Sequence, residues 1–304
     1  MSKIVITGGT GFIGGHLASR LIKMGHDVVQ YDINHVADWD ERLRGSFVYG
    51  SILNAEGLTY AFKSADYVFH LAGVASTVDC CNNIADAINI NCIGTTNVLN
   101  ACVLNDVKKV FIASSSLVSH RVSDSCIDLS QEGHVYTTTK LFMEMLAKDF
   151  ETMHNLSHTI LRFGVCYGPY MSEGVVVHNF LVNALYGRPM TVYGDGKQWR
   201  YFIFIDDLID GCIAALNSDI VDGRTYNIIP TWKTTINNVA KTIQHITGGD
   251  IAYVDKRKHD FTLQELSHEL PMNELEWEAS TKLLDGMLST LVWYRAHTVY
   301  KEVL

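Results

Sequence analysis

The sequence predicts an α/β protein with a doubly wound parallel sheet, followed by a smaller α/β region. Apolar runs rich in β-branched residues recur over about the first 160 residues, as is typical of buried parallel strands. Segments with helical spacing of apolar residues separate these runs, and such alternation produces a parallel sheet covered by helices. Past Gly168-Pro169 the strands and helices become shorter and less regular.

The first strand, turn and helix lie within Lys3–Gly15. Ile4-Val5-Ile6 is an apolar run, and the chain then passes through Gly8, Gly11 and Gly14 into a helical pattern that stops near Gly25. A glycine turn between a strand and a helix lets the backbone approach a pyrophosphate, and the helix N-terminus supplies free N–H groups. We therefore predict a dinucleotide site; the competing interpretation is an ordinary βαβ turn.

Asp32 indicates which dinucleotide this turn would bind. It ends the second predicted strand, 28–31, and lies 18 residues after Gly14. A carboxylate there suits a ribose 2′-hydroxyl and repels a 2′-phosphate. The next residues, Ile33-Asn34-His35, include no Arg or Lys, so NAD is favoured over NADP.

The remaining elements extend the same pattern. We expect a loop with a helical turn at 34–45, strands at 47–50, 67–71, 108–113 and 158–163, and helices at 54–62, 83–105 and 134–155. Later come helices at 175–186, 206–217, 234–246 and 275–301, with strands at 191–193 and 201–205. We assign residues 1–164 to a Rossmann domain that the chain rejoins at about 201–228, and 165–304 mainly to a substrate-binding domain.

Composition excludes several classes of function. The chain has 304 residues, of which 47% are apolar, and a net charge of −9, which argues against nucleic acid or an anionic membrane as partner. Seven cysteines without a CxxC pair, and thirteen histidines without metal-ligand spacing, predict reduced thiols, a cytoplasmic location and no metal. We see no signal-peptide pattern and no apolar run near the roughly 20 residues that span a bilayer.

Tyr136 and Lys140 form the second informative pattern. Residues four apart share one face of a helix, and a nearby ammonium, together with a nicotinamide cation, lowers a phenol's pKa. Tyr136 is thus a candidate acid/base for a substrate hydroxyl. The same spacing recurs at Tyr193 and Lys197, but glycines between them indicate a turn. Only the first pair has a strand ending in serines upstream, at 114–116.

These residues resemble the extended short-chain dehydrogenase/reductases, specifically their NAD-dependent sugar-nucleotide epimerase/dehydratase group. The resemblance covers nearly the whole chain. Its motifs here are Thr7–Gly14, Asp32, His70–Gly73, the N-x-x-G-T of Asn91, Gly94 and Thr95, Ser114-Ser115, Tyr136 with Lys140, Leu161-Arg162, Tyr167–Pro169, Thr191–Gly196 with Arg200, Asp206–Leu208, and Arg257 with Asp260.

The resemblance implies roles for individual residues. Ser115, Tyr136 and Lys140 would be catalytic, with Ser116 as the alternative hydroxyl. The cofactor would contact Gly8, Gly11, Phe12, Ile13, Gly14, Asp32, Ser51, Ile52, Leu71, Ala72, Gly73, Asn91, Ser114, Tyr136, Lys140 and Phe163. The substrate, a nucleotide sugar, would contact Ser115, Ser116, Tyr136, Val165, Arg200, Arg257 and Asp260. The two arginines would clamp its diphosphate.

The subclass depends on the two residues after Ser115. The group's 4,6-dehydratases place Asp-Glu after the catalytic hydroxyl and its decarboxylases a Glu two residues later, whereas here these positions are Ser116 and Leu117. This favours a 4-epimerase that reduces and reoxidises bound NAD in place. The alternatives are a keto-sugar reductase or sugar dehydrogenase, a 4,6-dehydratase, and a non-enzymatic NAD-binding protein.

Several positions depart from the group's pattern or have plainer interpretations. Ser119-His120 replaces Tyr-Gly, Ser51 replaces an Asp, and Val165 and Val176 stand where related enzymes often have Asn. Arg200 could form a surface ion pair, Arg257 could belong to a solvated charge run, and His70 could be a packed core histidine. By analogy with the group, the helices at 83–105 and 134–155 predict a homodimer.

Overall fold

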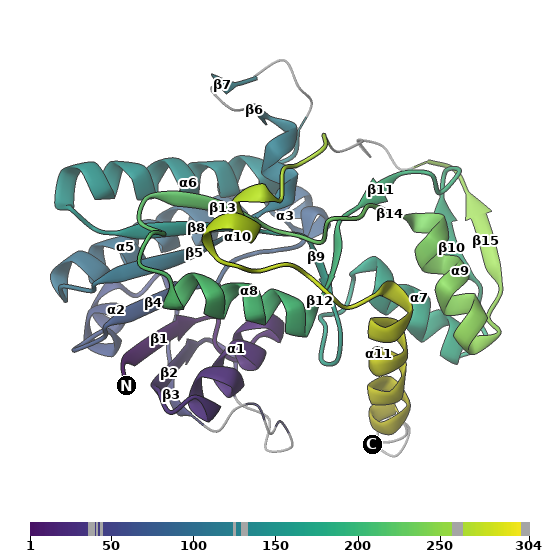
Figure 1. Cartoon of the computed structure of the whole chain (residues 1–304), viewed down its shortest axis with the longest axis horizontal. Coiled ribbons are helices and arrows are strands. Elements are labelled where there is room, and N and C mark those ends of the chain that lie inside the picture. Colours follow the sequence, from purple (N-terminus) through teal and green to yellow (C-terminus); the bar gives the residue numbers. More distant parts are fainter. Residues whose placement is uncertain are drawn as a thin grey trace.

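The structure is a computed structural model that describes residues 1–35, 40, 42, 45–123, 126–128, 133–256 and 264–298. Figure 1 shows one large sheet between two layers of helices, with a smaller lobe of helices and short strands beside it. The chain begins in the sheet and its C-terminal helix belongs to the smaller lobe. This arrangement confirms the predicted α/β, doubly wound fold.

The central sheet has seven strands in the order β13-β8-β5-β4-β1-β2-β3, and every neighbouring pair is parallel. Its strands are β1 (Lys3–Thr7), β2 (Asp27–Asp32), β3 (Ser46–Tyr49), β4 (Tyr67–His70), β5 (Lys109–Ser115), β8 (His158–Phe163) and β13 (Arg224–Ile228). The strand order reverses between β1 and β4. A crevice at the carboxyl ends of the strands beside such a reversal is where open α/β sheets bind ligands.

Alternate side chains of each strand enter different cores. Ile4 and Ile6 pack with Leu17 of α1 (Phe12–Lys23), whereas Val5 packs with Leu58 and Val98 on the opposite face. The first face is covered by α1 and α8 (Ile205–Asn217), and the second by α2 (Ala55–Ala61), α5 (Gly94–Leu104) and α6 (Val135–His154). The continuous apolar runs in the sequence reflect this burial on both faces.

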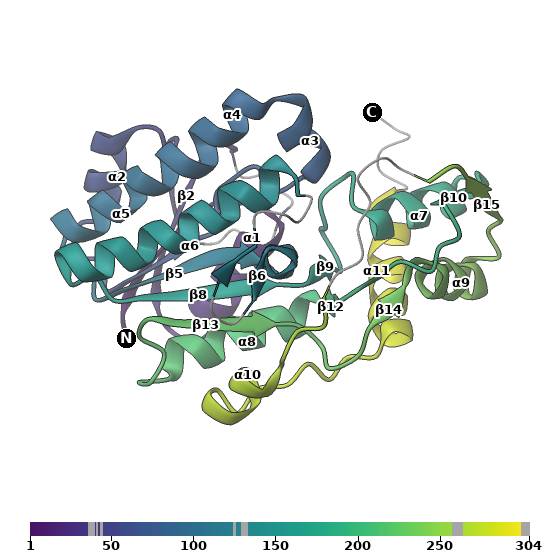
Figure 2. The same cartoon turned by 90° about the horizontal axis from the view of Figure 1, so that it is seen from above.

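The smaller lobe contains α7 (Val176–Leu185), α9 (Ile236–Thr247) and α11 (Leu283–Thr298) (Figure 2). Its strands pair in twos: β10 (Met190–Tyr193) with β15 (Ile251–Val254), β11 (Trp199–Arg200) with β14 (Thr234–Thr235), and β12 (Phe202–Phe204) with β9 (Val165–Tyr167). After β12 the chain returns to the main sheet through α8 and β13. The short elements are α3 (Thr77–Asn82), α4 (Ile84–Ile88), η1 (Asn89–Ile93), η2 (Ser116–His120), β6 (Val122–Ser123), β7 (Cys126–Ile127) and α10 (Glu269–Glu274).

Two predicted helices differ from the structure. The helix expected at 83–105 is instead α4, a π-helical turn η1 and α5. The helix expected at 275–301 begins only at Leu283. The preceding residues cross the start of α8, where the Trp277 indole donates to the Asp207 carbonyl (3.1 Å) and the Thr281 N–H donates to its carboxylate (3.0 Å). These tertiary hydrogen bonds replace the helical ones.

The segment Ile84–Leu104 corrects the expectation that no apolar stretch comes near the length that spans a bilayer. It is 21 residues long, with a mean hydropathy of 1.2, and so is long and apolar enough to cross a bilayer by length and composition alone. In the fold 44% of this run is buried, and Val98, Leu99 and Cys102 of α5 are fully enclosed by the core. Its apolar character therefore reflects packing against the sheet.

Candidate active site

The glycine turn lies at the carboxyl end of β1, against the loop that follows β4. Gly8 has φ +71°, and a Cβ there would lie 2.7 Å from the Ala72 nitrogen. A Cβ on Gly14 would lie 2.1 Å from the Gly8 oxygen. The turn therefore accepts only glycine at these positions. Gly11 precedes the first residue of α1, Phe12, and no side chain caps this helix, so the first N–H groups, including that of Ile13, remain for an anion.

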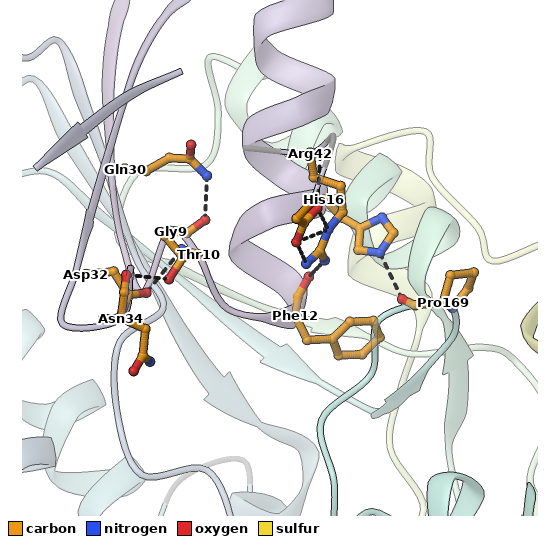
Figure 3. A network of polar contacts seen from close by, with 10 residues as sticks. Gly9, Thr10, Phe12, His16, Gln30, Asp32, Asn34, Arg42 and Pro169 are labelled. Carbon is orange, nitrogen blue, oxygen red and sulfur yellow. Dashed lines mark hydrogen bonds and ion pairs between the residues drawn. The ribbon is translucent and has the colours of Figure 1, made fainter. Parts of the chain in front are cut away.

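Asp32 is fixed beside this turn, as Figure 3 shows. Its carboxylate accepts hydrogen bonds from the Thr10 N–H (3.1 Å) and the Asn34 N–H (3.0 Å), and the residue is only 8% exposed. Gln30, also on β2, donates to the Gly9 carbonyl (2.7 Å). The sheet thus holds an oriented carboxylate at the position where a ribose next to the pyrophosphate would lie.

Residues at the ends of β3, β4 and β8 supply the rest of the predicted cofactor wall. Ser51 follows β3, and its hydroxyl accepts from the Leu53 N–H (3.2 Å). Ile52 is buried and fills the space over Gly94, where a Cβ would lie 2.4 Å from its side chain. Leu71, Ala72 and Gly73 follow β4 directly, and Phe163 ends β8.

Asn91, in the π-helical turn, fixes the loop that contains Gly73. Its side-chain oxygen accepts from the Val74 N–H (2.8 Å), and its amide donates to the Val74 carbonyl (3.1 Å) and to Thr139 Oγ1 of α6 (3.0 Å). The buried amide therefore links the cofactor loop to α6. Irregular π turns of this kind are frequent at functional sites.

His70 is a packed core histidine, as the plainer interpretation predicted. Nδ1 lies 2.8 Å from Thr7 Oγ1 and Nε2 lies 2.9 Å from Thr95 Oγ1. Burial, and to a smaller extent the charge of Lys140, lowers the pKa of His70 to about 3. The ring remains neutral and holds β1, β4 and α5 together.

The three predicted catalytic residues come together where β5 meets α6. The Ser115 side chain lies beside the Tyr136 phenol and lowers its pKa, and Ser115 Oγ accepts a hydrogen bond from the Leu117 N–H (3.2 Å). The Lys140 ammonium donates to the Ala113 carbonyl (2.8 Å) and lies 6.0 Å from the centre of the Tyr136 ring.

Burial dominates the ionisation of these groups. It raises the pKa of Tyr136 to about 12, while the hydrogen bond to Ser115 lowers it. Burial also lowers the pKa of Lys140 to about 8. The sequence predicted that Lys140, together with a nicotinamide cation, lowers the pKa of Tyr136; among the chain's own groups burial dominates that pKa, and the charge of Lys140 is not one of its causes.

Two residues near this site, Glu144 and Cys80, were missed by sequence reasoning. Ser114 was predicted to contact the cofactor, but its hydroxyl donates to Glu144 Oε1 (2.5 Å), which also pairs with Arg162. The available signal was the position of Glu144, four residues after Lys140 and on the same helix face. Cys80 packs in a small core with Tyr136, and burial raises the pKa of its thiol to about 11.

The substrate side is less tightly defined. Ser116 is buried directly after β5, and Val165 begins β9, where its N–H donates to the Tyr201 carbonyl (2.7 Å). Arg200 lies on β11 and donates to the Trp199 carbonyl (2.7 Å). Its charge, with those of Arg121 and His120, helps lower the pKa of His134 at the start of α6. Arg257 and Asp260 lie outside the described residues.

Comparison with known proteins places this site in a family. The model of the NAD dependent epimerase/dehydratase family matches residues 4–228, which include the glycine turn, Asp32, Ser115, Tyr136 and Lys140. The chain belongs to this family. The resemblance stated from the motifs is thereby confirmed, and so is NAD as the cofactor.

Named relatives carry out more than one reaction. A UDP-N-acetyl-alpha-D-glucosaminuronate decarboxylase of Bacillus cytotoxicus is 29% identical, over 96% of this chain and 98% of the relative. The structure of a UDP-glucose 4-epimerase of Thermotoga maritima with UDP-glucose has a TM-score of 0.88 and 28% identity, over 97% of this chain and 99% of the other. MoeE5, in complex with UDP-glucuronic acid and NAD, has a TM-score of 0.88 and 27% identity over the same shares. The family is therefore established, whereas the reaction is not.

Proposed function

We propose that this protein is an NAD-dependent 4-epimerase of a nucleotide-diphosphate sugar, with a UDP-hexose as the substrate. The observation that carries the proposal is the residue pair after Ser115. Ser116 and Leu117 stand where the resemblance places the acids of dehydratases and the Glu of decarboxylases. Glu144 does not replace them, because its carboxylate is bound by Arg162 and Ser114. A site with a phenol and a hydroxyl, but without such an acid, suits reversible oxidation of a carbinol.

The chain's own residues would divide the chemistry between them. Tyr136 removes the proton of the sugar 4-hydroxyl and later returns it, while Ser115 donates a hydrogen bond to the same oxygen. Lys140 holds the nicotinamide ribose, and Asp32 holds the adenosine ribose. NAD, when bound, supplies the acceptor and donor of the C4 hydride. Between the two transfers the 4-keto sugar presents its other face, and Arg200 retains its diphosphate.

The relatives favour one further candidate, decarboxylation of a UDP-uronate, because a relative matched over almost its full length carries that name. Leu117 in place of Glu argues against it. Net oxidoreduction, by a keto-sugar reductase or a sugar dehydrogenase, is the third possibility on the same residues. These reactions differ in what they release, which makes them separable in one assay.

The test is to incubate the purified protein, without added cofactor, with UDP-glucose, UDP-N-acetylglucosamine and UDP-glucuronic acid in turn. We expect conversion of at least one sugar to its 4-epimer, with cofactor still bound. Release of carbon dioxide and a UDP-pentose would establish the decarboxylase instead. In a parallel incubation with added NAD or NADH, stoichiometric consumption of that cofactor would establish the oxidoreductase.

We also infer that the protein is a cytoplasmic homodimer that pairs through α5 and α6. These helices lie side by side on one face of the molecule (Figure 2). Phe142 and Met145 of α6, and Ile93 of the turn η1 that precedes α5, are exposed large apolar side chains. Solvent exposure of such a patch is unfavourable in a monomer. Size-exclusion chromatography with light scattering should give about twice the chain mass, and Phe142→Glu with Met145→Glu should give monomers.

A further inference from the structure

The end of β5 is tied to α6 at successive turns of the helix. The Ala113 carbonyl accepts a hydrogen bond from the Lys140 ammonium (2.8 Å), and the Ser115 side chain lies beside the Tyr136 phenol. Ser114 lies between these two residues of β5.

Ser114 makes a third tie, to Glu144. Its hydroxyl donates to Glu144 Oε1 (2.5 Å). Arg162 on β8 binds the same carboxylate with two hydrogen bonds, from Nε to Oε1 (2.9 Å) and from Nη2 to Oε2 (2.6 Å). The side chains of Glu144 and Arg162 are only 9% and 14% exposed. The carboxylate thus joins α6 to the ends of two neighbouring strands.

We propose that Glu144 is a positioning residue for the reaction. Through Ser114 and Arg162 it fixes α6 against the ends of β5 and β8, so that Tyr136 and Ser115 meet one substrate oxygen. It also places a negative charge one helical turn from Lys140 and so helps keep that side chain an ammonium. The inference rests on the proposed function, in which Tyr136, Ser115 and Lys140 do the chemistry.

The geometry gives Glu144 this role rather than one in proton transfer. Both of its oxygens accept hydrogen bonds from Arg162, and one also accepts from Ser114, so the anion is strongly favoured. Its charge opposes the effect of burial on Lys140. A displacement of about 1 Å between reacting groups can cost about a hundredfold in rate, so a clamp at this junction affects catalysis directly.

The first test separates the tie to β5 from the ion pair. Ser114→Ala removes the hydroxyl and leaves Glu144 paired with Arg162. We expect bound NAD and the melting temperature to stay near wild type, while kcat for the UDP-sugar that the enzyme converts falls about tenfold at unchanged KM. Ser114→Thr, which restores a hydroxyl, should recover most of the rate. Thr152→Ala, which removes an exposed hydroxyl bonded within α6 (3.0 Å), is the matched control.

The second test measures the charge and needs no substrate. Lys140 is titrated by NMR of its side chain in the NAD-loaded protein, with Lys140→Arg to assign its signal. Glu144→Gln should lower the apparent pKa of Lys140 by about one unit, because the carboxylate whose charge favours the ammonium is removed. Glu144→Gln combined with Arg162→Met avoids an unpaired buried arginine and should show the same shift, since Lys140 still lacks its anionic neighbour.

The outcomes are distinguishable. Wild-type rates in Ser114→Ala, together with an unshifted Lys140 titration in both Glu144 variants, would overturn the inference and reduce the cluster to a fold-stabilising ion pair. If the wild-type protein converts no UDP-sugar, the proposed function fails, and the titration alone decides the role of Glu144: a shift upholds it and no shift rejects it.

Discussion

The cofactor side and the substrate side of this site are built differently. Asp32 ends a six-residue strand and Ser115 a seven-residue strand of the parallel sheet, and both side chains are buried. Arg200, in contrast, lies on a two-residue strand and hydrogen-bonds the carbonyl of its own neighbour. In the proposed function the main sheet therefore positions the reacting groups, whereas a short strand of the smaller lobe carries the arginine that binds the diphosphate.

The largest effect is expected at the centre of the cofactor side. Tyr136→Phe removes the acid/base and should lower kcat about a thousandfold, with NAD retained and the melting temperature little changed. Rates are measured by product chromatography, and bound NAD by absorbance after denaturation. A variant with more than a tenth of wild-type activity would show that Tyr136 is not the acid/base.

The next effect concerns the glycine turn. Gly14→Ala puts a methyl group 2.1 Å from the Gly8 oxygen, so the backbone must move. We expect about a hundredfold weaker NAD binding and a loss of roughly 1–3 kcal/mol of stability. Gly25→Ala at the other end of α1 meets no atom within 4 Å but has φ +88°. It should lose about 1 kcal/mol and bind NAD normally. Calorimetric titration with NAD distinguishes the two.

On the substrate side the expected effect is on binding. Arg200→Ala should raise KM about ten- to hundredfold, with kcat changed less than threefold, because a charge-assisted hydrogen bond is worth about 1.5–3 kcal/mol. Arg20→Ala is the control, since it removes an exposed ion pair with Asp210 (2.5 Å). Unchanged steady-state kinetics for Arg200→Ala would mean that Arg200 does not bind the diphosphate.

The smallest effect is on stability in acid. The folded-state pKa of His70 is about 3, below an unfolded value of about 6.5, so the unfolded chain binds the extra proton between these values. Stability should therefore fall as pH drops below about 6.5, by roughly 1 kcal/mol per pH unit from this residue. Urea unfolding of the NAD-loaded protein at pH 7 and pH 5 measures it. His70→Gln should reduce the dependence of the unfolding free energy on pH. An unchanged dependence would mean that groups other than His70 cause it.

The sequence predicted the elements of the cofactor side for a physical reason. Its strands are apolar runs buried on both faces, so local spacing is enough to place Gly8 and Asp32 at strand ends and Tyr136 on a helix. Pairing of the two-residue strands β11 and β14 depends on contacts between distant segments and leaves no periodic signal. The hydrogen bond between Glu144 and Ser114 likewise depends on how α6 is positioned along the sheet, and the spacing of residues in the sequence does not determine that position.

The most direct test of the proposed reaction traces the hydride itself. UDP-glucose carrying deuterium at C4 is incubated with the purified protein without added cofactor, and the product is analysed by mass spectrometry and NMR. We predict UDP-galactose that keeps its deuterium at C4, because the hydride leaves and returns to the same sugar on bound NAD. Deuterium lost to solvent, or found in free NADH, would contradict a hydride that is returned in place.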